Sequence, residues 1–349
     1  MKKTVLRASA IMVALLVALS GLAFAGGGKE EAGKPAAQRI ALSHTASLES
    51  PWQKASVQFA DYVNSRTGGR YNVEVFGNGV LCQRNWKIMF EMTQSGSSQV
   101  GIESVTALAS IVPEIGAMGL PFLFESTEHV INFLNTNPDV WKRWLYGGFE
   151  KQKLVVLSIT PRPFRQINNN KRLIKTPEDI KDLKFRVPAS QLFVKIFEAI
   201  GAKPVPLPSG EIYTAIQLGT VVGEDNSIPV QYDFKTHEVA KNFTIWNYIA
   251  DASILFINKN IWDGMSEADK AVYKDGGKLW GDINIKQDTE YTVVAMQNME
   301  KAGVKFYTMT DAEKVPFKKM VQSVYADMAK QVGEDNFKTF MDEVAKTKK

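Results

Sequence analysis

The sequence is poor in the residues that most often carry catalysis or covalent cross-links. Its 349 residues include one cysteine, Cys82, and three histidines, His44, His129 and His237. A single cysteine excludes an internal disulfide, and no two histidines stand at a spacing typical of metal ligands. The motifs of zinc proteases, nucleophile-elbow hydrolases, P-loop NTPases and dinucleotide-binding proteins are also missing. The sequence therefore disfavours an enzyme and indicates neither a metal nor a cofactor.

A strong excess of one charge is missing as well. The formal net charge is +5, and removing the basic residues of the N-terminal segment lowers it to about +2. Because charges of both signs are interspersed, we do not expect a nucleic-acid partner. Beyond the N-terminus, no segment approaches the ~20 apolar residues of a transmembrane helix. The length and the 45% hydrophobic content suit a globular protein of two domains.

The N-terminus has the three parts of a secretory signal. A basic start at residues 1–7 precedes an apolar run at residues 8–22 and the cleavage pattern Ala23-Phe24-Ala25, with small residues at its first and third positions. We therefore expect residues 1–25 to be a cleaved signal peptide and the mature protein to reach the periplasm. Residues 26–38 are polar and rich in glycine, which predicts a flexible linker.

Short apolar strands alternate with helices along the rest of the chain, which predicts an α/β fold with parallel sheets. Strands are predicted at residues 39–42, 71–76, 99–102, 154–159, 254–258 and 304–307, and helices at residues 51–65, 86–95, 128–145, 232–239, 266–302 and 312–344. We expect Gly276-Gly277 to bend or interrupt the long helix, and Gly333 to break the last one.

Residues 182–229 carry the most informative pattern. The predicted order is a strand at residues 183–187, a helix after Ser190, a strand at residues 203–207, a short helix after Ser209 and a strand near Val221. Ser190 and Ser209 stand where helix N-caps belong, and Gly201 and Gly219 stand just past the predicted helix ends.

Arg186 lies at the carboxyl end of the first strand of this stretch, where ligands bind in open α/β sheets. Its guanidinium fork matches a carboxylate and stays charged at physiological pH. A salt bridge to a neighbouring acid is the alternative, but the strand-end position favours a ligand. Asn226 ends the third strand, although asparagine is also common in turns. A fixed cation beside a fixed amide indicates a receptor for a small anion.

Four further polar residues are candidates for ligand contacts, each with a structural alternative. Arg165 follows an apolar strand, and a ligand contact and a surface ion pair are equally supported there. Glu103 ends a short strand, where a carboxylate can also interact with a helix dipole. His44 ends the first strand but is also typical of a polar loop. Ser209 is first of all an N-cap residue.

Three segments resemble the substrate-binding proteins of tripartite ATP-independent periplasmic (TRAP) transporters, of the DctP type. They read FRQINNNKRLIKTPEDIKDLKFRVPAS, FEAIGAKPVPLPSGEIYTAIQLGTVVGEDNSIP and FINKNIWDGMSEADK, and weaker agreement is seen in VEVFGNGVL, QVGIES and LPFLF. Together these segments cover most of the chain from Arg39 onward, in the expected order.

The resemblance implies a two-domain clamp of type II periplasmic-binding-protein topology with a long interdomain helix. The domains are expected at residues 39–161 plus about 252–290, and at residues 162–251 plus about 291–349. Crossover strands are expected near residues 160–162 and 249–253. Such a clamp closes on a small organic acid and delivers it to the membrane permease subunits of a TRAP transporter.

The resemblance also implies roles for individual residues. Arg186 matches the arginine of the family's R-V-P motif, which forms a bidentate salt bridge to the ligand carboxylate. Arg165 fits an upstream ligand-contacting arginine within one residue, and Asn226 matches the asparagine of the G-Q-E-N-P motif. Glu103 matches a polar strand-end residue more loosely. The motif here reads GEDNS at residues 223–227, which leaves open how the ligand end opposite Arg186 is bound.

Two functions of other classes stay open at this point. The chain could be a ligand-sensing module for a signalling partner, or an exported enzyme acting on a small acid. The enzyme would need a nucleophile or a metal set that the sequence does not display. We expect a monomer, and the sequence does not indicate which carboxylate is bound.

Overall fold

The computed structural model describes residues 36–348, and one compact unit spans Ala37–Lys349. The predicted signal peptide at residues 1–25 and most of the predicted linker lie outside the described residues. Within the described part, no helix combines the length and the apolar character that a membrane crossing requires.

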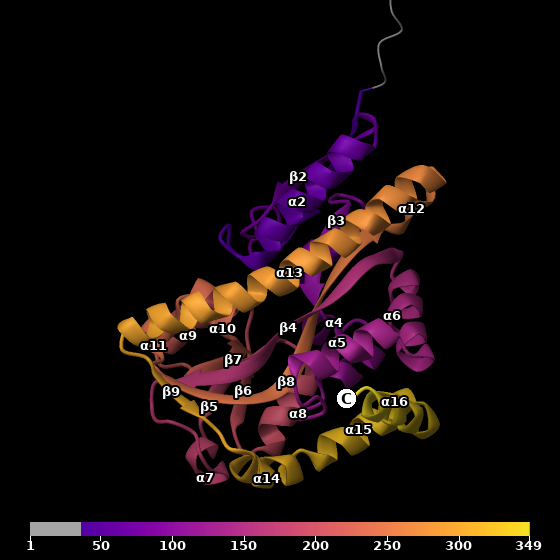
Figure 1. The fold of residues 1–349 in the computed structure, drawn as a ribbon. Helices are drawn as coiled ribbons and strands as arrows, with labels where there is room; N and C mark the ends of the chain where they lie inside the picture. Colours follow the sequence, from indigo (N-terminus) through magenta and orange to yellow (C-terminus); the bar gives the residue numbers. More distant parts are fainter. Residues whose placement is uncertain (1–35, 349) are drawn as a thin grey trace, which may run out of the picture. The chain divides into compact units, whose positions relative to one another are not determined.

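The strands span Gln38–Ser43 (β1), Tyr71–Phe76 (β2), Val100–Ser104 (β3), Leu154–Asn169 (β4), Lys184–Val187 (β5), Lys203–Pro206 (β6), Gly223–Ser227 (β7), Asn242–Asn258 (β8) and Lys305–Thr308 (β9). They form one sheet in the order β2-β1-β3-β8-β4-β7-β5-β6, with β9 paired to β8 (Figure 1). The pairs β1–β2, β1–β3, β5–β6, β5–β7 and β8–β9 are parallel. The pairs of β8 with β3 and β4, and of β4 with β7, are antiparallel. The α/β prediction is confirmed, but the sheet is mixed rather than purely parallel.

The α-helices span Pro51–Arg66 (α2), Trp86–Ser95 (α3), Val105–Leu108 (α4), Thr127–Thr136 (α5), Asp139–Lys151 (α6), Pro177–Ile180 (α7), Gln191–Ala199 (α8), Ile212–Gln217 (α9), Ile228–Asp233 (α10), Thr236–Val239 (α11), Lys259–Asp263 (α12), Glu267–Lys301 (α13), Asp311–Met320 (α14), Gln322–Val332 (α15) and Glu334–Lys346 (α16). Two 3-10 helices span Pro113–Gly119 (η1) and Ser209–Glu211 (η2).

Strands β4 and β8 are much longer than the sequence pattern predicts, at 16 and 17 residues. They pair antiparallel, with Thr160 opposite Ser253 and Arg162 opposite Asp251. The two predicted crossover segments therefore lie side by side. The pattern ends the first strand early because proline is unusual inside a sheet. Here a register shift spans Pro163 and accommodates it. The division into two domains stays a prediction.

Helix α13 is continuous over 35 residues, so the predicted interruption at Gly276-Gly277 is wrong. The glycines serve close packing instead. A Cβ atom at Gly276 would lie 3.2 Å from the Phe59 ring, and one at Gly277 would lie 2.8 Å from the Leu157 carbonyl oxygen. In Figure 1, α13 runs past α2 and β4, with which it is in contact.

Three other predicted helices are divided. The helix predicted at residues 128–145 is split into α5 and α6, because Asn137 is left-handed with φ 44° and Pro138 follows it. The helix predicted at residues 232–239 is split at Lys235, which has φ 57°. The predicted break at Gly333 is confirmed between α15 and α16, and the region predicted as helical at residues 312–344 is also divided at Val321, between α14 and α15.

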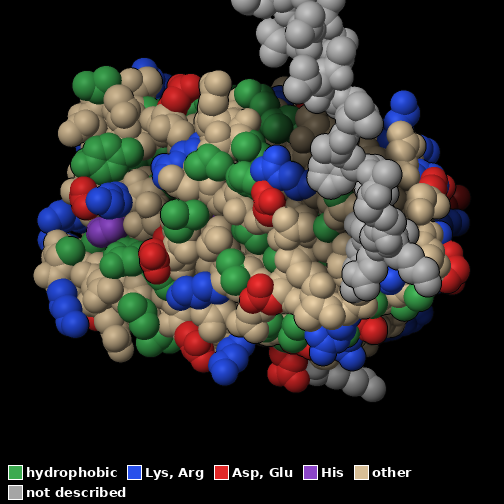
Figure 2. Space-filling view, turned by 90° about the horizontal axis from the view of Figure 1, so that it is seen from above, with side chains coloured by type: hydrophobic (Ala, Val, Ile, Leu, Met, Phe, Trp, Pro, Cys, Tyr) green, Lys and Arg blue, Asp and Glu red, His purple; other side chains and the backbone are tan. Residues whose placement is uncertain are grey.

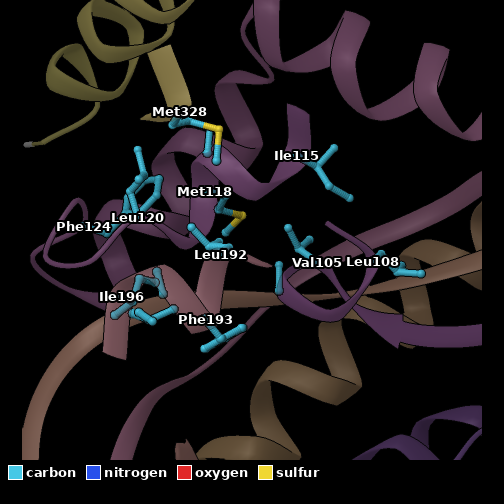
Figure 3. Packing of buried hydrophobic residues seen from close by; sticks show 14 of the residues in the cluster. Val105, Leu108, Ile115, Met118, Leu120, Phe124, Leu192, Phe193, Ile196 and Met328 are labelled. Atoms are coloured by element: carbon cyan, nitrogen blue, oxygen red, sulfur yellow. The ribbon is translucent and has the colours of Figure 1, made fainter. Parts of the chain in front are cut away.

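The largest core cluster joins α8 to η1 and α15. Figure 3 shows Leu192, Phe193 and Ile196 of α8 packed near Met118 and Met328. The alternation along β5 directs Phe185 and Val187 into the same cluster and leaves Arg186 for the opposite side. On the face drawn in Figure 2, cationic and anionic side chains are interspersed, as the sequence predicts.

Candidate ligand-binding site

A cavity of about 650 Å³, counted with the solvent at its mouth, brings together residues from distant parts of the chain. Its lining is formed by Thr45, Ala46, Trp52, Trp86, Glu103, Ser104, Ala107, Arg162, Arg165, Arg186, Pro188, Ser209, Asn226, Val230, Asp233 and Phe234. Five of the six predicted ligand-binding residues are in this set. The sixth, His44, is not.

Arg186 is buried in the cavity wall, with its side chain 5% exposed. Its Nε donates a hydrogen bond to the Leu207 carbonyl oxygen at 2.9 Å. Its Nη1 lies 3.9 Å from Glu224 Oε2, which is at the outer limit of an ion pair. Within the described residues, neither Nη atom donates a hydrogen bond. The terminal face of the guanidinium is therefore available to a ligand.

The charge of Arg186 persists at neutral pH despite its burial. Desolvation lowers the pKa of Arg186 to about 10, and the nearby Glu224 carboxylate opposes this shift. Burial in turn raises the pKa of Glu224 to about 6, with Arg186 opposing. Glu224 Oε1 is buried without a hydrogen-bond partner. The pair is loose, and the acid does not fill the fork of the arginine.

Arg165 lines the same cavity but is fully engaged by the protein. Its Nε and Nη2 donate to Asp225 Oδ1 at 3.0 and 2.6 Å, and Nη2 also donates to the Asp225 carbonyl oxygen at 2.9 Å. Tyr248 donates its hydroxyl to the same carboxylate. Burial alone would lower the pKa of Arg165, but Asp225 and the more distant Asp251 outweigh it and raise the pKa above its usual range. A ligand role for Arg165 stays a prediction.

Asn226 lies beside Arg186 at the end of β7 and is 7% exposed. Its Nδ2 is 3.4 Å from Glu224 Oε2, and its Oδ1 accepts the Ser227 backbone N–H at 3.1 Å. The two acids of β7 therefore have separate roles. Glu224 faces Arg186, whereas Asp225 holds Arg165.

Glu103 is a buried acid that forms no salt bridge within the described residues. Its Oε1 accepts the backbone N–H of Ser104 at 2.8 Å. Burial raises the pKa of Glu103 to about 7. Its place in the lining fits either a proton donor to a ligand oxygen or an acceptor from a ligand hydroxyl.

His44 and Ser209 differ from what their sequence positions suggest. His44 is fully buried, and its Nε2 lies 3.0 Å from Gln53 Oε1. Burial lowers the pKa of His44 to about 4, so the ring is neutral at physiological pH. The N-cap prediction for Ser209 is wrong, because Ser209 begins a 3-10 turn and Glu211 precedes α9. Its hydroxyl donates to the Arg84 carbonyl oxygen at 3.2 Å instead.

Sequence reasoning missed Arg162 as a site residue. Its Nη1 pairs with Asp251 Oδ2 at 3.1 Å, and its guanidinium lies 4.9 Å from the centre of the Trp52 ring. Arg162 and Arg165 are three residues apart, a spacing that places side chains on opposite faces of a regular strand. The register shift between them allows both to line the cavity. In the sequence, only the short R-P-F-R segment, which contains both arginines, could have indicated that Arg162 belongs to the site.

No group of three or more His, Cys, Asp or Glu side chains in the described part of the chain is arranged to hold a metal ion. The cavity instead combines three arginines, an unpaired acid, an amide and aromatic rings. Such a concave site with few convergent polar groups is typical of small-molecule binding. The fold and the cavity together define a solute-binding protein.

Comparison with known proteins gives the family. Residues 42–331 match the family described as bacterial extracellular solute-binding protein, family 7 (DctP), and the chain belongs to it. The resemblance to DctP-type TRAP proteins is thereby confirmed. The family is one of solute receptors rather than enzymes.

Individual relatives are similar over most of their length. The 2,3-diketo-L-gulonate-binding periplasmic protein YiaO of Escherichia coli strain K12 is 26% identical, over 84% of this chain and 87% of the relative. The sugar acid binding protein DctPAm from Advenella mimigardefordensis, in complex with galactonate, is 25% identical with a TM-score of 0.83, covering 89% and 99%. A TRAP periplasmic solute binding protein from Bradyrhizobium, in complex with galacturonate, is 27% identical with a TM-score of 0.80, covering 87% and 100%.

Proposed function

We propose that this protein is a periplasmic receptor that binds a small organic acid through Arg186 and delivers it to the permease subunits of a TRAP transporter. The observation that carries the proposal is the buried guanidinium of Arg186, whose terminal nitrogens lack a hydrogen-bond acceptor within the described residues. A ligand carboxylate supplies the planar, bidentate acceptor that this fork matches. The family membership supports the transport role.

The ligand class we favour is a hydroxylated monocarboxylate, such as a sugar acid. Glu103 and Asn226 offer donors and acceptors for ligand hydroxyls around the cavity. Glu103 forms no salt bridge within the described residues. A second ligand carboxylate near it would therefore be repelled when Glu103 is ionised. The relatives whose names specify galactonate, galacturonate and 2,3-diketo-L-gulonate fit this class.

Closure of two domains around the ligand completes the proposed mechanism. The paired strands β4 and β8 connect the halves that we assign to the two domains, and α13 contacts both. Trp280 of α13 donates to Ser56 Oγ at 3.4 Å, and Asn298 donates to the Tyr232 hydroxyl at 3.1 Å. A ligand that contacts both halves stabilises the closed state by its differential affinity for it.

The test is a binding screen followed by one substitution. Native mass spectrometry of the purified protein and calorimetry with galacturonate, galactonate and succinate should identify a hydroxylated monocarboxylate. Arg186→Lys keeps the charge but removes the fork, so affinity should fall at least about tenfold, or roughly 1.4 kcal/mol. The exposed Arg172 is a matched control, and Arg172→Lys should bind like the unaltered protein. Equal affinity in Arg186→Lys would overturn the assignment of Arg186.

A further inference from the structure

A second cavity adjoins the ligand cavity along the loop between β5 and α8. Pro188 lines the ligand cavity, whereas the next residues, Ala189 and Ser190, line the second one. Its volume is about 1130 Å³, counted with the solvent at its mouth. The lining is formed by Ala109, Ser110, Pro113, Gly116, Ala189, Ser190, Gln191, Leu192, Val194, Lys195, Pro206, Val324, Asp327, Met328 and Gln331. The predicted ligand-binding residues lie outside this set.

One end of the second cavity is formed by the N-terminus of α8. The backbone N–H groups of Gln191, Leu192 and Phe193 have no hydrogen-bond acceptor within the described residues. Such groups carry the positive end of the helix dipole and favour a bound anion.

Ser190 provides a second, independent indication of a ligand. It is only 5% exposed, lines this cavity and directly precedes α8. Its hydroxyl does not cap the helix, and within the described part of the chain it has no other hydrogen-bond partner. A largely buried residue whose hydroxyl has no partner and that lines a cavity at a helix N-terminus is well placed to donate to a ligand oxygen.

The remaining walls are mainly apolar. Figure 3 shows Leu192 on α8 and Met328 on α15 in the packing beside η1. A Cβ atom at Gly116 would lie 3.0 Å from Ala109 Cβ and 3.4 Å from Met328 Cε, so glycine allows close packing in this wall. Lys195 and Asp327 pair with each other at 2.6 Å and leave no net charge among the lining side chains. The positive N-terminus of α8 is therefore the main charge in the cavity, and it attracts an anion.

We propose that this cavity is a second binding site, which takes an amphipathic carboxylate. The carboxylate lies at the N-terminus of α8, where it accepts from the Ser190 hydroxyl and the free backbone N–H groups. The apolar tail lies against Leu192, Val324 and Met328. A small inorganic anion would leave these apolar walls unused, whereas a tail of several methylene groups buries them.

Octanoate, below its micellar concentration, is a suitable probe. Calorimetry is done in the Arg186→Ala protein, because that substitution disables the proposed ligand site and isolates the second cavity. Octanoate should bind with a stoichiometry of one. The additional change Ser190→Ala should weaken binding about tenfold, as expected for a hydrogen bond to a charged group.

Ser110→Ala is the matched control. Ser110 lines the same cavity, but its hydroxyl already donates to the Ala107 carbonyl oxygen at 3.1 Å. Its removal should leave octanoate affinity unchanged, and the neutral analogue octanamide should bind at least about tenfold more weakly than octanoate. The proposal is overturned if octanoate does not bind to Arg186→Ala, if both serine substitutions act alike, or if octanamide binds equally well.

Hydrogen exchange gives a test that does not depend on a variant folding. In the unaltered protein saturated with its carboxylate ligand, octanoate should slow amide exchange at Gln191, Leu192 and Phe193. Amides of α16, which does not line the cavity, should exchange as before. Unchanged exchange at the start of α8 would contradict the second site while leaving the proposed role of Arg186 intact.

Discussion

Arg165 and Arg186 line the same cavity and are almost equally buried, yet their surroundings differ. Arg165 has a bidentate partner in Asp225, a carbonyl acceptor and a second carboxylate nearby. Arg186 has one carbonyl acceptor and a carboxylate at 3.9 Å. A buried charge with a complete set of partners stabilises the fold, whereas one with an incomplete set is ready to accept a ligand. We propose from this comparison that Arg186 captures the ligand and that the contacts of Arg165 mainly stabilise the fold; the predicted ligand role of Arg165 is untested.

The largest expected effect is on stability, at Arg165. Arg165→Ala leaves the Asp225 carboxylate buried without its cation, and unfolding free energy should fall by about 3–5 kcal/mol. Urea unfolding followed by circular dichroism measures this change. Arg186→Ala should be milder, because Glu224 can take up a proton near its pKa of about 6. Equal destabilisation by the two substitutions would contradict the division of roles.

The next effect is on binding, at Arg186. Arg186→Ala removes the charge that faces the cavity, and affinity for the carboxylate ligand should fall at least about a hundredfold, or roughly 2.7 kcal/mol. Calorimetry on protein that has a native circular dichroism spectrum measures it, with Arg172→Ala as the control. A loss below about fivefold would mean that another group holds the carboxylate.

Glu103 extends the comparison to buried acids, since Asp225 is paired with Arg165 whereas Glu103 forms no salt bridge within the described residues. The pKa of Glu103 is raised from 4.5 to about 7, so the folded state holds this proton more tightly than the unfolded state. The contribution of Glu103 to the free energy of unfolding is fully present below pH 4.5 and is lost as the pH rises through 7. The unfolding free energy changes by at most about 1.4 kcal/mol per pH unit through this group. Urea unfolding between pH 4.5 and 8 should show that the unfolding free energy declines less steeply with pH in Glu103→Gln than in the unaltered protein. An unchanged profile would show that Glu103 does not titrate there.

The smallest effect is expected at Ser209, which lines the cavity and donates its hydroxyl to the Arg84 carbonyl oxygen. Ser209→Ala removes one neutral hydrogen bond, so ligand affinity should fall by less than about fivefold, or roughly 1 kcal/mol. Calorimetry with the carboxylate that the binding screen identifies measures this change in affinity. A loss of tenfold or more would show that the hydroxyl contacts the ligand directly.

Local features of the fold follow well from the sequence. Strand β2 and helix α3 have the predicted bounds. These features depend on hydrophobic periodicity and on side chains within a few residues. The placement of Arg186 at a strand end depends on the same local signals.

The cavity partners could not be predicted, because they come from distant segments. Arg165 meets Asp225 60 residues further along, and Ser209 meets Arg84 across 125 residues. Arg162 reaches the cavity only through a register shift that periodicity does not reveal. Which arginine is paired and which is open is therefore a property of tertiary structure rather than of local pattern.

A crystal structure of the protein with its organic acid ligand bound would test the proposed role of Arg186. We expect a ligand carboxylate whose two oxygens lie about 2.7–2.9 Å from the terminal nitrogens of Arg186. It also predicts that Arg165 keeps its bidentate contact with Asp225. A carboxylate held by Arg165 or Arg162, with Arg186 still facing only Glu224, would contradict it.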